Sequence, residues 1–79
     1  MTVIYFAQAR RLAGIASEPL ALPPPVTAEA LWQELLARHP ALAPLRPVTR
    51  LARNGVFAEA DTLFALGDEI ALIPPVSGG

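Results

Sequence analysis

TAEALWQELLARHP, residues 27–40, carries the strongest helix signal in this chain of 79 residues. Thr27 is a favourable N-cap, because its hydroxyl can accept a hydrogen bond from a free N–H group of the first turn. Leu31 and Leu35 are spaced so that they share one face of the expected helix. Pro40 ends the helix, since proline has no N–H to donate. We therefore predict one main helix in this segment, with its apolar face packed on the core.

Two short strands are predicted before this helix. Thr2–Ala7 (TVIYFA) is β-branched and aromatic, and it is too short for a helix. Ser17–Pro23 predicts a second strand, which Pro19 confines to an edge of the sheet or delays in its start. We expect its paired part to be Leu20–Leu22. Between the two strands, QARRLAG predicts a short helical turn with Gly14 as its C-cap.

Three further strands are predicted after the helix. Ala41–Pro47 is a proline-broken connector with at most one helical turn. Asn54-Gly55 is a strong signal for a two-residue hairpin turn between two short strands. Gly67-Asp68 forms a corner, and the last strand runs from Glu69 to Ile73. This order of elements predicts an α+β fold, in which one main helix packs across one face of a mixed sheet.

The composition fits a single domain over residues 1–79, with 74–79 as a flexible C-terminal tail. The net charge is −1 and all six basic residues are arginines, so we expect no nucleic-acid partner. There is no cysteine, and we expect no metal site; His39 is interpreted as a cation at a helix C-terminus. No apolar run reaches the roughly 20 residues that span a bilayer. Together with an N-terminus that lacks a signal-peptide pattern, this predicts a cytoplasmic protein without membrane contact.

The sequence ends in IPPVSGG, which is typical of a segment that inserts into a partner. Pro74 and Pro75 restrict the backbone, and this limits the entropy lost on insertion. Gly78 and Gly79 have no Cβ atom, so their backbone can pass through a narrow channel. The residues expected to enter the partner are Pro74, Pro75, Val76, Ser77 and Gly78.

Three segments of the chain resemble those of a known protein family. They are YFAQARRLAG near the start, LARNG in the middle and LGDEIALIPPVSGG at the end. The chain resembles the small subunit of molybdopterin synthase, a sulfur carrier with the ubiquitin-like β-grasp fold. The resemblance runs nearly end to end and is weakest in Ala16–Pro25 and Ala41–Val48. It implies a ubiquitin-like β-grasp fold and a carrier protein that is not an enzyme when alone.

The resemblance also implies a reaction cycle at Gly79. An adenylating, E1-like enzyme activates the C-terminal carboxylate with ATP, and a sulfur donor converts the acyl-adenylate into a thiocarboxylate. The large subunit of the synthase then takes up the tail, in an expected heterotetramer, and the sulfur passes to a pterin precursor of the molybdenum cofactor. The chain itself binds no cofactor, since ATP and the sulfur donor are used in trans. This cycle agrees with the chemistry of a terminal carboxylate. An α-carboxyl group has a pKa of about 3.3–3.7 and is an unreactive anion at neutral pH, so it needs a leaving group before a nucleophile can attack it.

A partner surface is expected beside the tail. The first and last predicted strands are apolar on both sides, whereas a single helix covers only one face of the sheet. We therefore expect Phe6, Phe57 and Ile73 to form an outer patch for partners; the alternative is that some of them lie in the core. Arg10 stands where the family carries an arginine after FAQ, and it is either a partner contact or a solvated loop residue. Arg11 departs from the acidic residue that the family pattern leads us to expect.

Other functions remain open at this point. A sulfur carrier for thiamine synthesis or tRNA thiolation has the same Gly-Gly end. A protein-tagging, ubiquitin-like modifier would be joined through Gly79 to lysines of its targets. A non-covalent interaction module would tolerate extension of the tail, whereas a carrier must keep Gly79 free.

Overall fold

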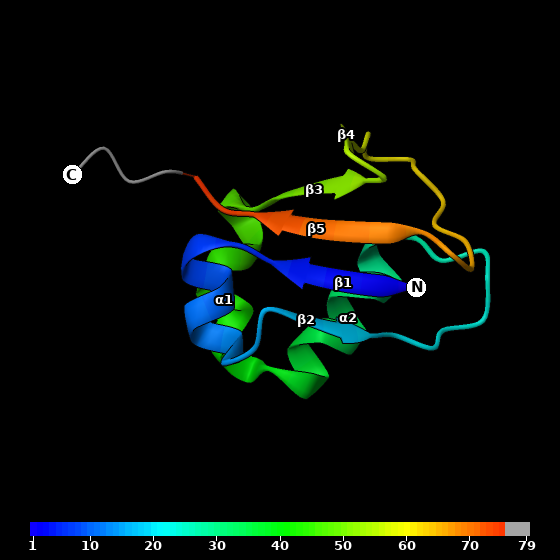
Figure 1. Ribbon diagram of the computed structural model, residues 1–79. Coiled ribbons are helices and arrows are strands. Elements are labelled where there is room, and N and C mark those ends of the chain that lie inside the picture. The colour runs from blue at the N-terminus through cyan, green and yellow to red at the C-terminus, as the bar shows by residue number, and fades with distance from the viewer. Residues whose placement is uncertain (76–79) are drawn as a thin grey trace.

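The computed structural model describes residues 1–75, and within them the strands form one mixed sheet (Figure 1). The strand order is β2-β1-β5-β3-β4. The elements, in chain order, are β1 (Thr2–Tyr5), α1 (Ala7–Ala13), β2 (Ser17–Pro19), α2 (Ala28–Arg38), the 3₁₀ helix η1 (Pro40–Val48), β3 (Arg50–Arg53), β4 (Val56–Phe57) and β5 (Glu69–Ile73).

The centre of the sheet is the parallel pair β1 and β5. Thr2 lies opposite Glu69 and Tyr5 lies opposite Leu72, so the two strands leave the sheet at the same end. The first and last strands of the chain are therefore neighbours in the sheet. The hairpin of β3 and β4 extends the sheet on one side, and the short edge strand β2 closes the other side.

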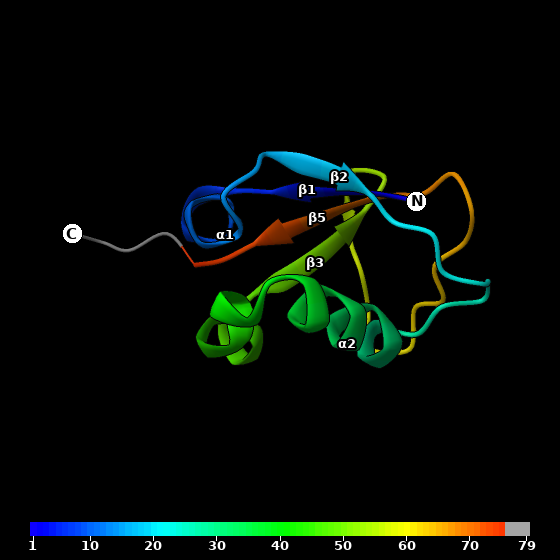
Figure 2. The same ribbon diagram turned by 90° about the horizontal axis from the view of Figure 1, so that it is seen from below.

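The helix α2 lies along one face of the sheet (Figure 2). The hydroxyl oxygen of Thr27 accepts a hydrogen bond of 3.1 Å from the N–H group of Ala30, which confirms the predicted N-cap. Leu31, Trp32 and Leu35 are buried, as the spacing of apolar residues predicts. Each fully buried leucine contributes about 1.5–3 kcal/mol to folding.

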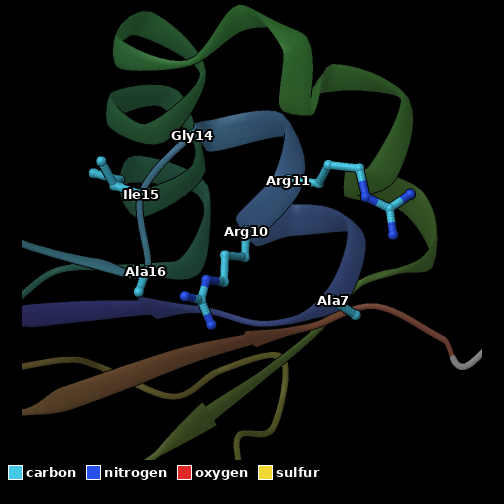
Figure 3. A pocket seen from close by; sticks show the side chains of 6 residues that line it. All are labelled: Ala7, Arg10, Arg11, Gly14, Ile15 and Ala16. Atoms are coloured by element: carbon cyan, nitrogen blue, oxygen red, sulfur yellow. The ribbon is translucent and has the colours of Figure 1, made fainter.

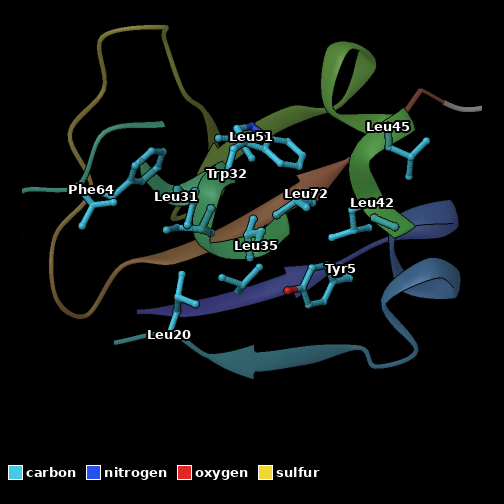
Figure 4. Close-up of a cluster of buried hydrophobic side chains, with 14 residues drawn as sticks. Tyr5, Leu20, Leu31, Trp32, Leu35, Leu42, Leu45, Leu51, Phe64 and Leu72 are labelled. Atoms are coloured by element: carbon cyan, nitrogen blue, oxygen red, sulfur yellow. The ribbon is translucent and has the colours of Figure 1, made fainter. Parts of the chain in front are cut away.

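The core lies between α2 and the inner face of the sheet (Figure 4). The connector and the loop before β5 contribute to it as well as the strands and α2. The fully buried large side chains are Tyr5, Phe64, Leu31, Leu35, Leu42, Ile70, Leu72 and Val3.

Two elements differ from the sequence prediction. The strand β2 covers Ser17–Pro19, whereas we expected pairing over Leu20–Leu22. Pro19 lies in an edge strand as predicted, and Leu20 is buried in the core beyond the strand end. The connector after α2 is also more regular than expected, since η1 spans nine residues and buries Leu42 and Leu45.

The short helix α1 follows β1 directly and lies at the end of the sheet where the chain leads toward the C-terminus (Figure 1). Gly14 ends it with a φ of 81°, and its N–H group donates to the carbonyl oxygen of Arg10. The predicted glycine C-cap is therefore confirmed. Within residues 1–75 there is no helix of the length and apolarity needed to cross a membrane.

Candidate functional site: the tail root and the outer sheet face

The predicted tail begins where β5 leaves the sheet. The N–H group of Phe6 donates to the carbonyl oxygen of Leu72 at 3.3 Å, so the start of α1 is fastened beside the last strand. After Ile73, Pro74 is buried and Pro75 is exposed. Pro74, the first residue of the predicted tail, is therefore packed against the domain, and Pro75 is the last residue that the structure describes. The remaining predicted site residues, Val76, Ser77, Gly78 and Gly79, lie outside the described residues, and their roles stay predictions.

The sheet face opposite α2 carries a continuous apolar surface. The strand register places Ile4 opposite Ala71, Ala71 opposite Ala52, and Ala52 opposite Phe57, which forms one row across four strands. Together with Gly55 and Glu69, this surface lines a groove of about 240 Å³. We call its apolar residues the outer patch: Ile4, Phe6, Ala52, Phe57, Ala71 and Ile73.

Three residues of the outer patch are those predicted from the sequence. Phe6 and Phe57 are each 48% exposed, and Ile73 is half-buried. Each lines the groove on the outer face, which agrees with the expected location outside the core. Their contact with a partner stays a prediction. Ile73 is the last residue of β5, directly before the predicted tail. The outer patch therefore extends to this start of the tail, residues 73–74, which we call the tail root.

The turn between β3 and β4 is fastened to the start of β5. The side-chain oxygen of Asn54 accepts a hydrogen bond of 2.9 Å from the N–H group of Glu69, and its amide nitrogen donates to Asp68 at 3.0 Å. Asn54 and Gly55 have φ angles of 51° and 85°, as the predicted two-residue turn requires. The hairpin that carries Phe57 is therefore fixed in position over the groove.

The carboxylate of Asp68 accepts hydrogen bonds at this turn and does not form a carboxylate pair with Glu69. Its second oxygen accepts a hydrogen bond of 2.9 Å from the N–H group of Ala65. The hydrogen bond from Ala65, followed by that from the amide of Asn54, holds the pKa of Asp68 below its usual value. Asp68 and Glu69 therefore start the last strand, in agreement with the corner predicted at this point.

The helix α1 presents two arginines beside the tail root. Arg10 and Arg11 are both exposed and leave the helix in different directions (Figure 3). Both line a depression whose other residues are Ala7, Gly14, Ile15 and Ala16. Arg10 therefore lies on a helix rather than in a loop, and its predicted contact with a partner stays a prediction.

Arg50 is a charged residue of the outer face that sequence reasoning missed. Its guanidinium carbon lies 3.8 Å from the centre of the Phe57 ring. Arg50 also lies opposite Ile73 in the register of β3 and β5. The neighbouring sequence, a proline-rich connector, does not indicate on which face of the sheet Arg50 lies. Only the strand register shows that Arg50 belongs to the face that carries the outer patch.

A polar cluster around Glu18 was also missed. One oxygen of its carboxylate accepts hydrogen bonds from the Tyr5 hydroxyl and the His39 ring, both at 2.5 Å. Its other oxygen accepts a hydrogen bond of 3.0 Å from Arg38. Burial alone would raise the pKa of Glu18, but hydrogen bonds from Tyr5, His39 and Arg38 outweigh burial and lower it. Burial and the hydrogen bond to Glu18 raise the pKa of Tyr5. The cluster joins β1, β2 and α2, and it does not contribute to the groove.

These features define a class of protein. A mixed sheet with a parallel central pair, formed by the first and last strands and crossed by one main helix, is the ubiquitin-like β-grasp, an α+β fold. The ThiS family matches residues 3–79 of this chain, and the chain belongs to that family.

Individual relatives are similar over almost the whole chain. A human protein named molybdopterin synthase sulfur carrier subunit is 42% identical over 80 residues, which cover 98% of this chain and 91% of the relative. The protein of the same name from Chlamydomonas reinhardtii is 37% identical and covers 98% and 95%. The crystal structure of SAMP1 from Haloferax volcanii has a TM-score of 0.83 and 31% identity, and covers 99% of this chain and 97% of that one. The family and fold implied by the sequence motifs are thus confirmed.

Proposed function

We propose that this chain is the sulfur-carrier subunit of a molybdopterin synthase. The observation that carries the proposal is the 42% identity to the human sulfur carrier subunit over nearly all of both chains. The family match also extends through residue 79, so it includes the Gly-Gly segment that the chemistry requires. The outer patch supports the proposal, because an exposed apolar surface that reaches the tail root is suited to a docking partner.

The proposed chemistry takes place at the carboxylate of Gly79. A carboxylate oxygen attacks the α-phosphorus of ATP, pyrophosphate leaves, and an acyl-adenylate forms. A sulfur nucleophile at the oxidation level of sulfide then displaces AMP and leaves a thiocarboxylate. This sulfur then bonds to the pterin precursor, and water cleaves the resulting thioester, which leaves the sulfur on the pterin and returns the carrier to its carboxylate form. The chain supplies the acyl group and the docking surface, while partners supply ATP, the sulfur donor and the catalytic residues.

Two partners follow from this cycle. An adenylating enzyme must hold the tail near the nucleotide, and the large subunit of the synthase must hold it near the pterin. We propose that both dock on the outer patch, that carrier and large subunit form a heterotetramer, and that Arg10 contacts a partner beside the tail. Because one surface serves both partners, they bind the carrier in turn. We also propose a cytoplasmic location, where ATP for this cycle is available.

Intact-mass spectrometry tests the proposal. The protein is incubated with its cognate adenylating enzyme, ATP and a sulfide-level sulfur donor. The expected result is the mass gain of one sulfur replacing one oxygen, confined to the C-terminal peptide. The loaded protein should then support dithiolene formation when the cognate large subunit and a pterin precursor are added. A carrier that gains no sulfur with its cognate enzyme would refute the proposal.

A second candidate is favoured by the likeness to SAMP1, since related structures are named small archaeal modifier protein 1. In that case Gly79 would be joined to lysine side chains of target proteins. The two functions share the adenylation step and differ in the acceptor. Digestion of cell extracts and a search for peptides that carry a Gly-Gly remnant on lysine distinguishes them.

A further inference from the structure

Opposite charges lie at the two ends of the outer patch. Glu69 and Ile73 are the first and last residues of β5, and with Ala71 they face outward. Arg50 lies directly opposite Ile73 on the neighbouring strand β3. At about 3.3 Å per residue, the backbones of Glu69 and Arg50 lie roughly 13 Å apart along the strand direction. The basic end is the one beside the tail root.

Arg50 is both held in place and available to a partner. Its guanidinium stacks on the ring of Phe57 at 3.8 Å, and such stacking orients the planar group. Arg38 and Arg46, by contrast, form ion pairs with glutamates. Among residues 1–75 no carboxylate lies within ion-pair distance of Arg50. An exposed guanidinium stacked on a ring is suited to bind a carboxylate through two parallel hydrogen bonds.

Glu69 is the matching group at the other end. Its backbone is fixed on both sides by Asn54, since its N–H donates to the Asn54 side chain at 2.9 Å and its carbonyl accepts from the Asn54 N–H at 2.8 Å. Its side chain is exposed and lines the groove. In the part of the chain that the structure describes, no cation pairs with it. The acidic end is thus also fixed in position and open to a partner.

We propose that the large subunit presents a carboxylate to Arg50 and a basic side chain to Glu69, on either side of the apolar contact. This inference rests on the proposed function and adds the charge pattern that the partner must carry. The apolar residues alone would allow the carrier to dock in either direction along the groove. Two opposite charges exclude the reversed orientation, because it would place like charges together. The allowed orientation directs Pro75 and the residues after it toward the partner group that faces Arg50.

Titration of the carrier with its cognate large subunit tests the charge pattern. Arg50→Glu and Glu69→Arg should each weaken binding about tenfold or more, with the larger loss at low salt. Arg50→Met keeps the apolar stem against Phe57 and removes only the charge, so it should weaken binding by a smaller factor. Arg53→Glu is the matched control, since it makes the same charge change on the same strand at an exposed residue that does not line the groove, and it should bind as the wild type does. Thermal unfolding of each variant verifies that it is folded.

Comparison with Phe57→Asp separates this inference from the proposed function. If Phe57→Asp loses binding while Arg50→Glu and Glu69→Arg bind as the wild type does, the outer patch is the docking surface but the charge pattern is wrong. If Phe57→Asp also binds normally, docking on the outer patch is wrong. Restoration of binding to Arg50→Glu by an Asp→Arg or Glu→Arg change in the large subunit would identify the facing carboxylate directly.

Discussion

The Nε2 atom of His39 lies 2.5 Å from the Oε2 atom of Glu18, and this contact joins the C-terminal end of α2 to the edge strand β2. The ring of Tyr5 meets the His39 ring edge-on, with 5.5 Å between the ring centres. Because Tyr5 belongs to β1 and also donates to Glu18, one carboxylate holds together two strands and the main helix. An edge strand of three residues has few backbone hydrogen bonds, so these side-chain contacts are a substantial part of what fixes β2.

Replacing Glu18 by Gln should lower the free energy of unfolding by about 1–3 kcal/mol at pH 7, because its donors, among them the buried hydroxyl of Tyr5, lose a charged acceptor. The loss should depend on pH. The folded protein lowers the pKa of Glu18, so the unfolded chain binds the proton more readily. The stabilisation is therefore complete above the usual pKa near 4.5 and disappears as the pH falls through the lower pKa of the folded state.

Urea unfolding of the wild type and Glu18→Gln at several pH values measures this effect. The difference between the two proteins should be largest near neutral pH and should shrink below about pH 4.5. Glu59→Gln makes the same chemical change at an exposed position and is the control. A difference that stays constant down to pH 3 would show that Glu18 contributes through packing and not through its charge.

Replacing Leu35 by Ala should cost about 2–5 kcal/mol, since this side chain is fully buried between α2 and the sheet. A loss of this size is a large part of the stability of a domain this small. Gln33→Ala, on the exposed side of the same helix, should change the free energy of unfolding by less than about 0.5 kcal/mol. Equal effects of the two changes in chemical denaturation would contradict the role of α2 as the cover of the core.

The sequence was most informative where the determining interactions are local. The Thr27 cap, the Leu31 and Leu35 spacing and the Asn54-Gly55 turn each depend on residues a few positions apart, and each is present in the structure as predicted. The start and end of the last strand, Glu69–Ile73, were also predicted, because a Gly-Asp corner and a proline pair bound it.

Features that depend on pairing across long stretches of sequence could not be predicted. The Glu18–His39 contact joins residues 21 positions apart, and neither residue carries a signal for the other. The strand β2 was placed too late, because the apolar Leu20 suggested a strand position, whereas its side chain in fact enters the core. Arg50 could be assigned to the outer face only from the register of β3 with β5.

Replacing Phe57 by Asp should weaken binding to the large subunit and to the adenylating enzyme about tenfold or more, while the protein stays folded. The ring is 48% exposed and lines the groove, so its removal costs little of the core. Val56→Asp is the matched control on the same strand. Val56 is 69% exposed, and its side chain points to the opposite side of the sheet because neighbouring strand residues alternate.

Calorimetric titration with each partner, together with the thermal midpoint of each variant, measures the two effects separately. Val56→Asp should bind as the wild type does. If Phe57→Asp unfolds the protein, the ring belongs to the core. If both variants lose affinity equally, the partner contacts the edge of the sheet and not the outer patch.

Deleting Gly79, or adding one residue after it, should abolish adenylation and leave the thermal midpoint almost unchanged. The reacting group is the terminal carboxylate of Gly79, whose oxygen attacks ATP, and either change places the terminal carboxylate one residue away from the position that the enzyme requires. The thermal midpoint should not change, because Pro75, the last described residue, is exposed and the residues after it are expected to contribute little to the core. Ser77→Ala keeps the length of the tail and should still be adenylated. Release of pyrophosphate and the intact mass report the reaction. A tail-extended protein that forms a thiocarboxylate without first being trimmed would show that Gly79 is not the site.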